Sequence, residues 1–536
     1  MNIIGIYGAY DWDDLLPDNE RFMHDAGCTI FIDGKHICSI SEERLSRKKL
    51  DASYPYQSIE YCLSYSNIDF LDVDIVSYIP PMTCDLNHKS TKDSLIKVRE
   101  SFPNAEIRLC SHHLAHAAST VFTSPFNEGT FLTFDGAGSG VYDVYRDKYN
   151  FIENNSIGYF NKEKRIFRFY NMPENKVNNF GHFYSFVSKL AFEYKMSRKS
   201  TDWYEWQSVP GKIMGLSAYG SLDEYSGEYT VVEHAIPYIT FPEGGFTTYP
   251  PTPEDAAKWL QKVFEDGLLH LLRSLRKHHL DSTVCFAGGT YLNILANTKI
   301  KESGIFEEIH IPPFTDDSGL SIGAALWCCY EENETIHLPE DIAFLGQKYT
   351  NFVIEDEMRK NNLKWIPYDP DVVADKIENQ KIVAWFQGRS EAGPRALGSR
   401  SILMSPTKAE NKDILNKRVK HREEWRPFAG IIREEDVGEY FEEGFVTPHM
   451  LYSQTSKTDK IPAITHADKT CRIQTITREQ NSRIYELLGK LEVPVVLNTS
   501  FNDNGQPIVE SPYHAIEAFL AMDIDTLVIG DYIVDK

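Results

Sequence analysis

The sequence predicts an α/β protein with two domains, on the strength of three observations. β-rich apolar runs alternate with helical segments along most of the 536 residues, which are too many for one hydrophobic core. A strand, a turn with a carboxylate and glycines, and a hairpin occur near the N-terminus and again from Gly129 onward, which indicates a duplicated unit with a ligand between its halves. The acidic, weakly patterned segment Tyr330–Thr350 follows, so we expect domains at 1–340 and 341–536.

Composition and charge argue against several classes of protein. The formal net charge of −23 repels nucleic acid and anionic membrane surfaces, so we expect neither as a partner. No apolar run approaches the ~20 residues that span a bilayer, and no basic region precedes an apolar one at the N-terminus, so we expect a cytoplasmic protein. Nine scattered cysteines without C-x-x-C spacing argue against a zinc ribbon and for reduced thiols.

The first fifty residues predict a strand, a hairpin and a charged segment. Ile3–Tyr7 is apolar and β-rich, and two further β-rich runs are joined by Asp33-Gly34, a strong hairpin signal. The second run leads into the charged segment Ser41–Lys49. Such a segment is usually a solvated face, but α/β folds also place ligand loops directly after a strand.

Residues Cys110–Gly140 contain the first candidate metal ligands. His112 and His116 are four apart in a segment that reads as helix, so their imidazoles share one face. Asp135 follows an apolar strand and precedes glycines, and Asp317 lies in a similar glycine context at a helix start. Histidines with carboxylates suit iron, zinc or manganese and leave positions open for ligand oxygens. The alternative is that the histidines are satisfied structural residues and that Asp317 is an N-cap.

The stretch before the boundary predicts a phosphate- or ribose-binding helix start. Gly211–Gly220 is expected to be a turn punctuated by glycines, and Ala256–His279 an amphipathic helix. A buried strand, Thr283–Phe286, then meets the pair Gly288-Gly289 and a helix whose first backbone N–H groups can hold phosphate or ribose. Asn293 on that helix strengthens this signal modestly.

The C-terminal third contains a cationic region in an otherwise acidic chain. Six arginines and four lysines fall between residues 389 and 426, among glycine-containing loops. Glycines let backbone donors approach an anion, and arginine makes planar bidentate contacts to phosphate oxygens. Interleaved glutamates and the absence of a long basic helix favour a compact phosphate ligand over a nucleic-acid backbone. Further on we expect a strand ending in Asn498-Thr499-Ser500, a helix opening at Ser511-Pro512 and a closing hairpin.

In this order the motifs resemble those of the NodU/CmcH/TobZ-type O-carbamoyltransferases over nearly the whole chain. The matching stretches are H-D-x-G, E-E-R-x-S-R-K-K, H-H-L-A-H-A, F-D-G-x-G, G-K-I-M-G-L-S-x-Y-G, A-G-G-x-x-L-N, D-S-G-L-S-I-G-A-A, G-P-R-A-L-G-S-R-S-I-L, V-K-x-R-E-x-x-R-P-F-A and L-N-T-S-F-N-x-x-G-x-P-I-V. The resemblance implies an N-terminal actin-like ATPase (ASKHA) domain, related to the tRNA threonylcarbamoyl transferases, and a C-terminal YrdC-like domain. It also implies that carbamoyl adenylate forms from carbamoyl phosphate and ATP in the YrdC-like part. The carbamoyl group would then pass to a substrate hydroxyl at the metal-containing actin-like site.

The resemblance assigns roles to individual positions. The iron ligands would be His112, His116, Asp135 and Asp317. Carbamoyl phosphate would be held by Arg395, Arg400, Lys420, Arg426 and Asn498. The nucleotide would be lined by Lys212, Gly215, Gly288, Gly289 and Asn293. Near the transferring group would lie His24 and Lys49, with His24 as our candidate general base. Two departures are A-G-P-R in place of F-G-P-R and a doubled aspartate, which makes Asp316 a rival of Asp317.

The acceptor, the metal and the assembly stay open at this point. We expect ATP and Fe²⁺ as cofactors, with another divalent metal or Mg²⁺ as alternatives, and a small-molecule hydroxyl, as in natural-product or antibiotic biosynthesis, as the acceptor. A homodimer is one option. Three stretches rich in Tyr, Phe, Asn and Glu are candidates for the acceptor pocket: Asp11–Glu20, Asp143–Asn178 and Glu224–Pro253. Competing functions are HypF-like or TsaD-like carbamoylation of a non-hydroxyl acceptor, disfavoured by the absent zinc motifs and the acidic charge, and a non-catalytic nucleotide sensor.

Overall fold

The structure is a computed structural model. It describes residues 1–9, 23–80, 89–136, 140–143, 148–151, 155–170, 180–196, 203–222, 230–232, 238–240, 252–278 and 280–536. The acceptor-pocket candidate Asp11–Glu20 lies outside the described residues, as do large parts of the other two candidates. In the described part of the chain, no helix is both long and apolar enough to cross a membrane.

The chain divides into two compact units, each of which is described by itself. The first consists of Met1–Glu42 and Leu50–Leu338. The second consists of Pro339–Lys536 together with the short segment Glu43–Lys49. Most of the charged run near the N-terminus is therefore part of the second unit.

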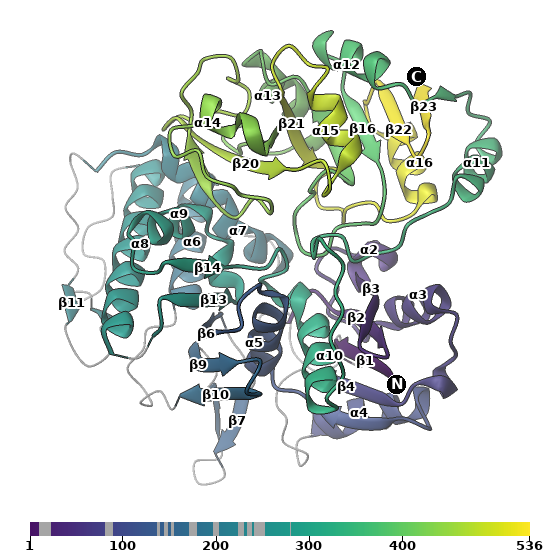
Figure 1. The fold of residues 1–536 in the computed structure, drawn as a ribbon. Coiled ribbons are helices and arrows are strands. Elements are labelled where there is room, and N and C mark those ends of the chain that lie inside the picture. Colours follow the sequence, from purple (N-terminus) through teal and green to yellow (C-terminus); the bar gives the residue numbers. More distant parts are fainter. Residues whose placement is uncertain are drawn as a thin grey trace. The chain divides into compact units, whose positions relative to one another are not determined.

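The first unit contains two five-stranded sheets with the same topology (Figure 1). In each sheet the first strand pairs with an antiparallel hairpin on one side and with two parallel strands on the other. The first sheet, in the order β3-β2-β1-β4-β5, consists of β1 (Asn2–Tyr7), β2 (Gly27–Ile32), β3 (Lys35–Ser41), β4 (Ile75–Ile79) and β5 (Glu106–Leu109). The second, in the order β10-β9-β6-β13-β14, consists of β6 (Glu128–Phe134), β9 (Asn155–Asn161), β10 (Ile166–Tyr170), β13 (Thr283–Ala287) and β14 (Glu308–His310). The predicted duplication is confirmed.

Individual residues explain one turn and one contact between helices in the first unit. The β2–β3 hairpin turns at Asp33 and Gly34, whose φ angles of 49° and 72° are those of a tight hairpin turn that favours this residue pair. Helices α5 (His112–Thr123) and α10 (Leu320–Glu331) lie side by side, as Figure 1 shows. They approach closely because Gly323 has no side chain: a Cβ there would lie 1.8 Å from the carbonyl oxygen of Ala115.

The remaining described elements of the first unit are helices and short strands. The helices are α3 (Tyr56–Ser66), α4 (Lys89–Ser101), α6 (Phe180–Met196), α7 (Trp203–Leu216), α8 (Pro253–His278) and α9 (Ile294–Glu302). The short strands are β7 (Gly140–Asp143), β8 (Lys148–Phe151), β11 (Thr230–Val232) and β12 (Tyr238–Thr240). The amphipathic helix expected from Ala256 is confirmed in α8.

The expectation of a turn over Gly211–Gly220 is wrong for most of that stretch. Helix α7 continues through it to Leu216, and a 3-10 turn, Ser217–Tyr219, follows. Packing of α7 against α6 and α8 outweighs the low helix propensity of its two glycines, which costs about 1 kcal/mol each. Gly211 and Gly215 therefore lie in a helix.

The second unit is built on one mixed nine-stranded sheet. Its strands, in the order β15-β23-β22-β16-β17-β21-β18-β20-β19, are β15 (Ile366–Pro367), β23 (Tyr532–Asp535), β22 (Thr526–Ile529), β16 (Val383–Phe386), β17 (Arg400–Met404), β21 (Val495–Ser500), β18 (Ala429–Arg433), β20 (Thr470–Ile476) and β19 (Ser453–Thr455). Its helices are α11 (Asn351–Lys360), α12 (Pro370–Glu378), α13 (Glu410–Leu415), α14 (Val437–Tyr440), α15 (Ser482–Leu488) and α16 (Pro512–Ala521). A short helix, α2 (Glu42–Ser46), contributes most of its residues to this unit. The α/β class is thus confirmed for both units.

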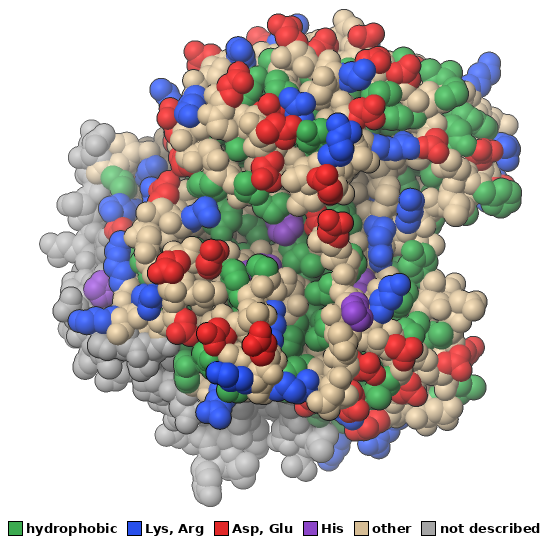
Figure 2. All heavy atoms as spheres, viewed as in Figure 1, with side chains coloured by type: hydrophobic (Ala, Val, Ile, Leu, Met, Phe, Trp, Pro, Cys, Tyr) green, Lys and Arg blue, Asp and Glu red, His purple; other side chains and the backbone are tan. Residues whose placement is uncertain are grey.

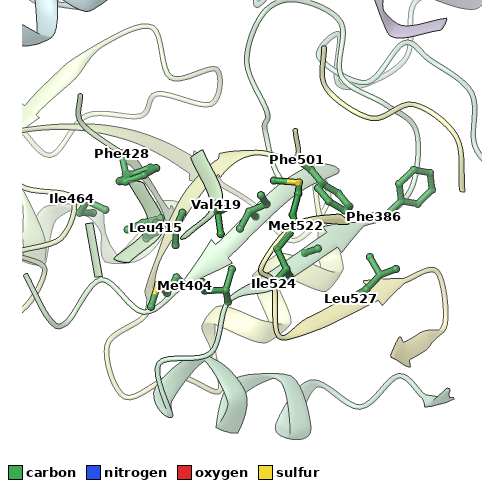
Figure 3. Close-up of a cluster of buried hydrophobic side chains, with 14 of the residues drawn as sticks. Phe386, Met404, Leu415, Val419, Phe428, Ile464, Phe501, Met522, Ile524 and Leu527 are labelled. Carbon is green, nitrogen blue, oxygen red and sulfur yellow. The ribbon is translucent and has the colours of Figure 1, made fainter. Parts of the chain in front are cut away.

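Both faces of this sheet are buried. Alternate residues of β16 point to opposite sides: Ala384 and Phe386 join one apolar cluster, while Val383 and Trp385 join another. The first cluster includes side chains from Ile354 to Val534, and Figure 3 shows part of it. The N-cap at Ser511 and the closing hairpin β22–β23 are confirmed.

Candidate metal centre and anion site

Four side chains from three separate segments converge inside the first unit. Ser111 caps α5, so the helix begins at His112 and presents His116 one turn later on the same face. Asp135 directly follows β6, and Asp317 opens a 3-10 turn that leads into α10. All four residues are buried, with exposed fractions of 0 to 8%. The sequence prediction that a helical histidine pair meets two distant carboxylates is therefore matched by the geometry.

The donor atoms are spaced as ligands of a single ion would be. The two Nε2 atoms of His112 and His116 are 3.1 Å apart, and both face Asp135 Oδ2, at 3.0 and 3.7 Å. Their distances to Asp317 Oδ1 are 3.5 and 3.4 Å. Adjacent ligands held at about 2.0–2.2 Å from one metal lie roughly 3.0–3.5 Å from each other. The four residues therefore fit a divalent metal, and their donor set of nitrogen and oxygen suits iron, zinc or manganese.

Each carboxylate uses only one oxygen toward the histidines. The other oxygen of Asp135, Oδ1, accepts a hydrogen bond from the backbone N–H of Gly289 at 3.0 Å. The other oxygen of Asp317, Oδ2, accepts one from the Tyr7 hydroxyl at 3.0 Å. Both carboxylates are thus oriented for single-oxygen ligation, which leaves coordination positions open for other ligands.

The electrostatics of the four residues indicate a site built for positive charge. Burial lowers the pKa of His112, but the charges of Asp317 and Asp135 outweigh it and raise that pKa to about 10. Burial favours the neutral form of Asp135, yet its hydrogen bonds to both histidines hold its pKa well below the ordinary range. Histidines bind a metal in their neutral form, so a bound cation would replace the protons that the raised pKa of His112 favours.

The structure separates the two adjacent aspartates. Asp317 lies among the four converging residues, whereas the Asp316 carboxylate accepts a hydrogen bond from the hydroxyl of Ser318. Burial and the nearby charge of Asp25 raise the pKa of Asp316 to about 7. Asp316 is therefore placed beside the candidate metal centre and not in its ligand set. Asp317 follows the N-cap position, so the N-cap alternative does not describe it.

His24 lies at the rim of this centre. Its Nδ1 is 2.8 Å from Asp25 Oδ2 and 4.0 Å from Asp317 Oδ2. Burial opposes a charge on His24, but Asp317 and the hydrogen bond to Asp25 outweigh it and raise its pKa to about 10. Asp25 has a φ of 60°, an uncommon conformation for a residue other than glycine, which turns its carboxylate toward the imidazole.

The residues predicted to line a nucleotide occupy different environments. Gly288 has a φ of 99°, and a Cβ there would lie 2.1 Å from Phe134 O, so both glycines of the pair lie against the Asp135 segment. Asn293 is the N-cap of α9, and both polar atoms of its side chain bond Gln261. A nucleotide contact by Asn293 would therefore have to displace a bond it already makes. The Lys212 ammonium lies 4.9 Å from the centre of the Phe192 ring, and Gly215 is in the last turn of α7.

The N-terminal charged segment is integrated into the second unit. Glu43 and Arg44 are buried, so the reading of this stretch as a solvated face is wrong for them. Arg44 donates to the carbonyl of Gly393 at 3.1 Å, and Arg47 donates to those of Pro507 and Ile508 at 2.7 Å. Lys49 pairs with Glu43 at 2.9 Å. Its charge is also among those that lower the pKa of Lys420, which places it near the cationic region.

A cluster of cations forms the candidate anion site of the second unit. Burial, together with the nearby charges of Arg395 and Arg426, lowers the pKa of Arg472 to about 9. Burial and the charges of Arg426 and Arg472 likewise lower the pKa of Arg422. Glu423 lies 3.7 Å from Arg426. We name this group the arginine cluster: Arg395, Arg422, Arg426 and Arg472. Within it, Arg422 donates to Asn416 Oδ1 at 2.8 Å and to the carbonyl of Pro427 at 3.1 Å. Like charges held together at half-buried positions favour an anionic ligand.

Two of the predicted anion-binding residues are engaged with the backbone instead. Arg400 is fully buried, donates to the carbonyls of Gln387 and Gly388 at 2.7 and 3.3 Å, and stacks on Phe386 at 3.7 Å. The Lys420 ammonium donates to the carbonyl of Ser500 at 3.0 Å and to both oxygens of Asn502 at 2.6 and 2.9 Å. These hydrogen bonds give both residues a structural role.

Buried polar side chains fix the loop that presents Arg395. One oxygen of Glu391 accepts from the backbone N–H groups of Leu397, Ser399 and Arg400 at 2.8 to 2.9 Å. The neighbouring carbonyls are held by amides: Asn498 donates to Ala396 at 2.9 Å and Gln474 to Leu397 at 3.0 Å. Asn498, predicted to contact carbamoyl phosphate, therefore uses its amide nitrogen to hold the Arg395 loop.

Sequence reasoning missed four residues of these sites. Tyr7 ends an ordinary apolar strand, and Asp25 was visible only as the neighbour of His24. Arg422 lay inside the basic stretch without being singled out. Arg472 is an isolated arginine in β20, about fifty residues further on, and only strand pairing brings it beside β18, the strand that follows Arg426.

Comparisons with known proteins agree with this organisation. The family model "Carbamoyltransferase N-terminus" matches residues 19–92, 86–235 and 241–326, and "Carbamoyltransferase C-terminus" matches residues 374–536. The nodulation protein NolNO of Sinorhizobium fredii is 30% identical over 97% of this chain and 80% of its own length. The 3'-hydroxymethylcephem-O-carbamoyltransferase of Streptomyces clavuligerus is 28% identical over 60% of this chain and 64% of its own length.

Among solved structures, HypF from T. kodakarensis matches 63% of this chain and 48% of its own, with a TM-score of 0.37 and 11% identity. The family models together cover most of the chain. The chain belongs to the carbamoyltransferase family.

Proposed function

We propose that this carbamoyltransferase forms carbamoyl adenylate from carbamoyl phosphate and ATP and transfers the carbamoyl group to a hydroxyl of a small molecule. The observation that carries the proposal is a pair of sites with opposite character. One unit holds four buried side chains that could bind one metal ion, and the other holds the arginine cluster. Family membership and the O-carbamoyltransferase relative support the same chemistry.

The arginine cluster suits the adenylating half-reaction. Water releases phosphate from carbamoyl phosphate, and the resulting carbamate oxygen attacks the α-phosphorus of ATP and displaces pyrophosphate, so the site must bind several anionic groups at once. Guanidinium groups bind phosphate oxygens in a bidentate manner and remain charged even when burial lowers their pKa to about 9, as for Arg472. The bonds from Glu391 and Gln474 to the Arg395 loop fix this arginine before the ligand arrives.

The metal centre suits the transfer half-reaction. A divalent metal bound by His112, His116, Asp135 and Asp317 would supply a Lewis acid for the negative charge that develops on the carbamoyl oxygen. His24 is the candidate base for the acceptor hydroxyl. Its Nδ1 faces Asp25, which favours a proton on Nδ1 and leaves Nε2 to accept one. The positive charge of a bound metal would oppose the effect of Asp317 that raises the pKa of His24.

The adenylating half-reaction can be tested without knowing the acceptor. Metal-loaded protein is incubated with ATP and carbamoyl phosphate, and release of pyrophosphate and phosphate is followed by chromatography. We expect release that depends on both substrates and is lost in Arg395→Ala. The matched control is Arg359→Ala, an exposed arginine of α11 that pairs with Glu355 and should leave release unchanged. No release from folded, metal-loaded protein in the absence and presence of hydroxyl acceptors would contradict the proposal.

Two further variants separate the half-reactions. His116→Ala should keep pyrophosphate release and lose transfer, because it changes only the metal centre. His24→Asn should lower transfer to an acceptor by roughly 100-fold or more while release continues. If His24→Asn abolished both activities, the residue would belong to adenylation or to folding and not to proton transfer.

A further inference from the structure

The geometry points to Tyr7 as a positioning residue of the metal centre. Tyr7 is the last residue of β1, is 2% exposed, and donates its hydroxyl hydrogen to Asp317 Oδ2 at 3.0 Å. The other oxygen of Asp317 faces the two histidines. The inference rests on the proposed metal centre and adds to it a residue that holds one ligand in place.

The direction of this hydrogen bond follows from chemistry. An ionised carboxylate only accepts, so the hydroxyl must be the donor. A phenol has an ordinary pKa of about 10, so at neutral pH Tyr7 carries the proton that this bond requires. A donor on the outer oxygen turns the inner oxygen toward the histidines and disfavours rotation of the carboxylate into a two-oxygen contact.

The same arrangement occurs at the second carboxylate, with a different donor. Asp135 uses Oδ2 toward the histidines and receives the Gly289 N–H on Oδ1. The two first strands of the duplicated sheets, β1 and β6, thus both end at the centre: β6 delivers the ligand Asp135, and β1 delivers the orienting residue Tyr7. The backbone donor at Asp135 cannot be removed by a side-chain substitution, whereas the donor at Asp317 can.

Tyr7 also contacts a second ligand. Its ring meets the imidazole of His112 edge to face, with centroids 6.0 Å apart and an interplanar angle of 81°. The ring and the hydroxyl therefore restrain His112 and Asp317 at the same time. Tyr7→Phe keeps the ring contact and removes only the hydroxyl, so it isolates the effect on Asp317.

The test is metal affinity, measured without any carbamoyl substrate. Metal-free protein is titrated with Co²⁺ in competition with a chromophoric chelator, and the visible spectrum of the Co²⁺ form is recorded. Tyr7→Phe should bind Co²⁺ about 10- to 100-fold more weakly, the range typical for loss of a hydrogen bond to a metal ligand. The spectrum should change in intensity as the carboxylate of Asp317 reorients.

The matched control is Tyr184→Phe. This buried tyrosine of α6 donates to Gln261 at 2.7 Å, so its substitution also removes one buried hydroxyl bond, at a residue that contacts none of the four ligands in the described structure. Its Co²⁺ affinity should equal that of the unsubstituted protein. Thermal unfolding of each metal-free variant verifies that both are folded.

Two outcomes would overturn the inference or its premise. Equal Co²⁺ affinity in Tyr7→Phe and Tyr184→Phe would overturn the role of Tyr7 alone. Absence of Co²⁺ binding by the unsubstituted protein would overturn the metal centre itself. If thermal unfolding shows that Tyr7→Phe is poorly folded at the titration temperature, all three proteins are titrated at a lower temperature at which it is folded, and the same comparison applies.

Discussion

The candidate metal centre and the arginine cluster each bring like charges together, but they differ in the sign of those charges and in the groups that surround them. In the first unit, two carboxylates are surrounded by hydrogen-bond donors, and their inner oxygens face histidine nitrogens at 3.0 to 3.7 Å. In the second unit, several guanidinium groups lower one another's pKa, and one carboxylate lies 3.7 Å from the cluster at Arg426. The first site brings nitrogen and oxygen donors together within reach of one ion, whereas the second brings guanidinium groups together.

This difference affects how each site responds to substitution. A ligand of the metal centre has one task, so its loss should abolish metal binding and leave adenylation intact. In the basic region, some cations hold the backbone while others are available to a ligand, so substitutions there should divide into losses of stability and losses of substrate binding. Figure 2 shows acidic and basic side chains interspersed on the face that it draws. The pattern of surface charge therefore does not distinguish cations that hold the backbone from cations that could bind a ligand.

The largest expected effect separates the two adjacent aspartates. Asp317→Asn should weaken metal binding by roughly 100-fold or more, because it replaces a charged ligand in a buried site. Asp316→Asn is the matched control and should keep metal, because its carboxylate bonds Ser318 and lies outside the four converging residues. Metal content after dialysis and Co²⁺ titration measure both. Equal retention by the two variants would contradict the ligand assignment.

The next effect divides the arginines. Arg472→Gln should raise the KM for carbamoyl phosphate about 10- to 100-fold, equivalent to the loss of one charge-assisted hydrogen bond. It should not lower stability, because it removes a buried charge from among like charges. Arg400→Gln should instead lower the free energy of unfolding by about 3 kcal/mol, since the carbonyls of Gln387 and Gly388 lose buried donors.

Initial rates of pyrophosphate release and urea denaturation measure these two properties side by side. A large KM effect for Arg400→Gln at normal stability would place its guanidinium on the substrate. A stability loss for Arg472→Gln without a KM effect would place it in the framework. Either result would remove the distinction drawn between the two residues.

The sequence predicted the convergence of the four candidate metal ligands better than the surroundings of each cation, for a physical reason. A metal centre needs few residue types, and a helical pair such as His112 and His116 is local, so motif reasoning finds it. The role of a cation depends on whether its hydrogen bonds go to the backbone or to a ligand. That difference between Arg400 and Arg472 follows from loop geometry and strand pairing, which the sequence does not state.

The same distinction applies to the fold. The hairpin at Asp33 and Gly34 and the duplication were predictable, because turn chemistry and repeated patterns are local. The continuation of α7 past Gly211 was not, because packing against α6 and α8 decides it. Membership of Glu43–Lys49 in the second unit was likewise hidden, since it depends on carbonyls such as those of Gly393 and Pro507.

A smaller effect is expected at the residue that holds the Arg395 loop. Glu391→Gln removes the charge that binds three backbone N–H groups but keeps one acceptor oxygen. We expect the KM for carbamoyl phosphate to rise several-fold, by about 1 kcal/mol, with little change in kcat. Glu391→Asp, which keeps the charge on a shorter side chain, is the comparison. A fall in kcat at unchanged KM would argue that Glu391 does not position Arg395.

A separate expected effect, on stability rather than on substrate binding, is the pH dependence of the metal-free protein. The folded-state pKa of His112 is raised to about 10, from an ordinary value near 6.5, by Asp317 and Asp135 in spite of burial. His116, Tyr7 and His24 also face these carboxylates. A raised pKa means that the folded protein binds the proton more tightly than the unfolded chain does. The resulting stability is fully present below pH 6.5 and is lost as pH rises toward 10.

Metal-loaded protein should not show this loss, because its histidines are already neutral and the metal supplies the charge. The melting temperature of metal-free protein should therefore fall relative to that of loaded protein between about pH 6.5 and 10. His112→Gln without metal should reduce the fall, since one titrating group is gone while His24, whose pKa is also raised to about 10, remains. A metal-free protein whose melting temperature followed that of the loaded protein across this range would show that protons do not occupy the place of the cation. In that case neither protons nor a metal would balance the carboxylates of the first unit. The electrostatic difference between this site and the arginine cluster would then not hold.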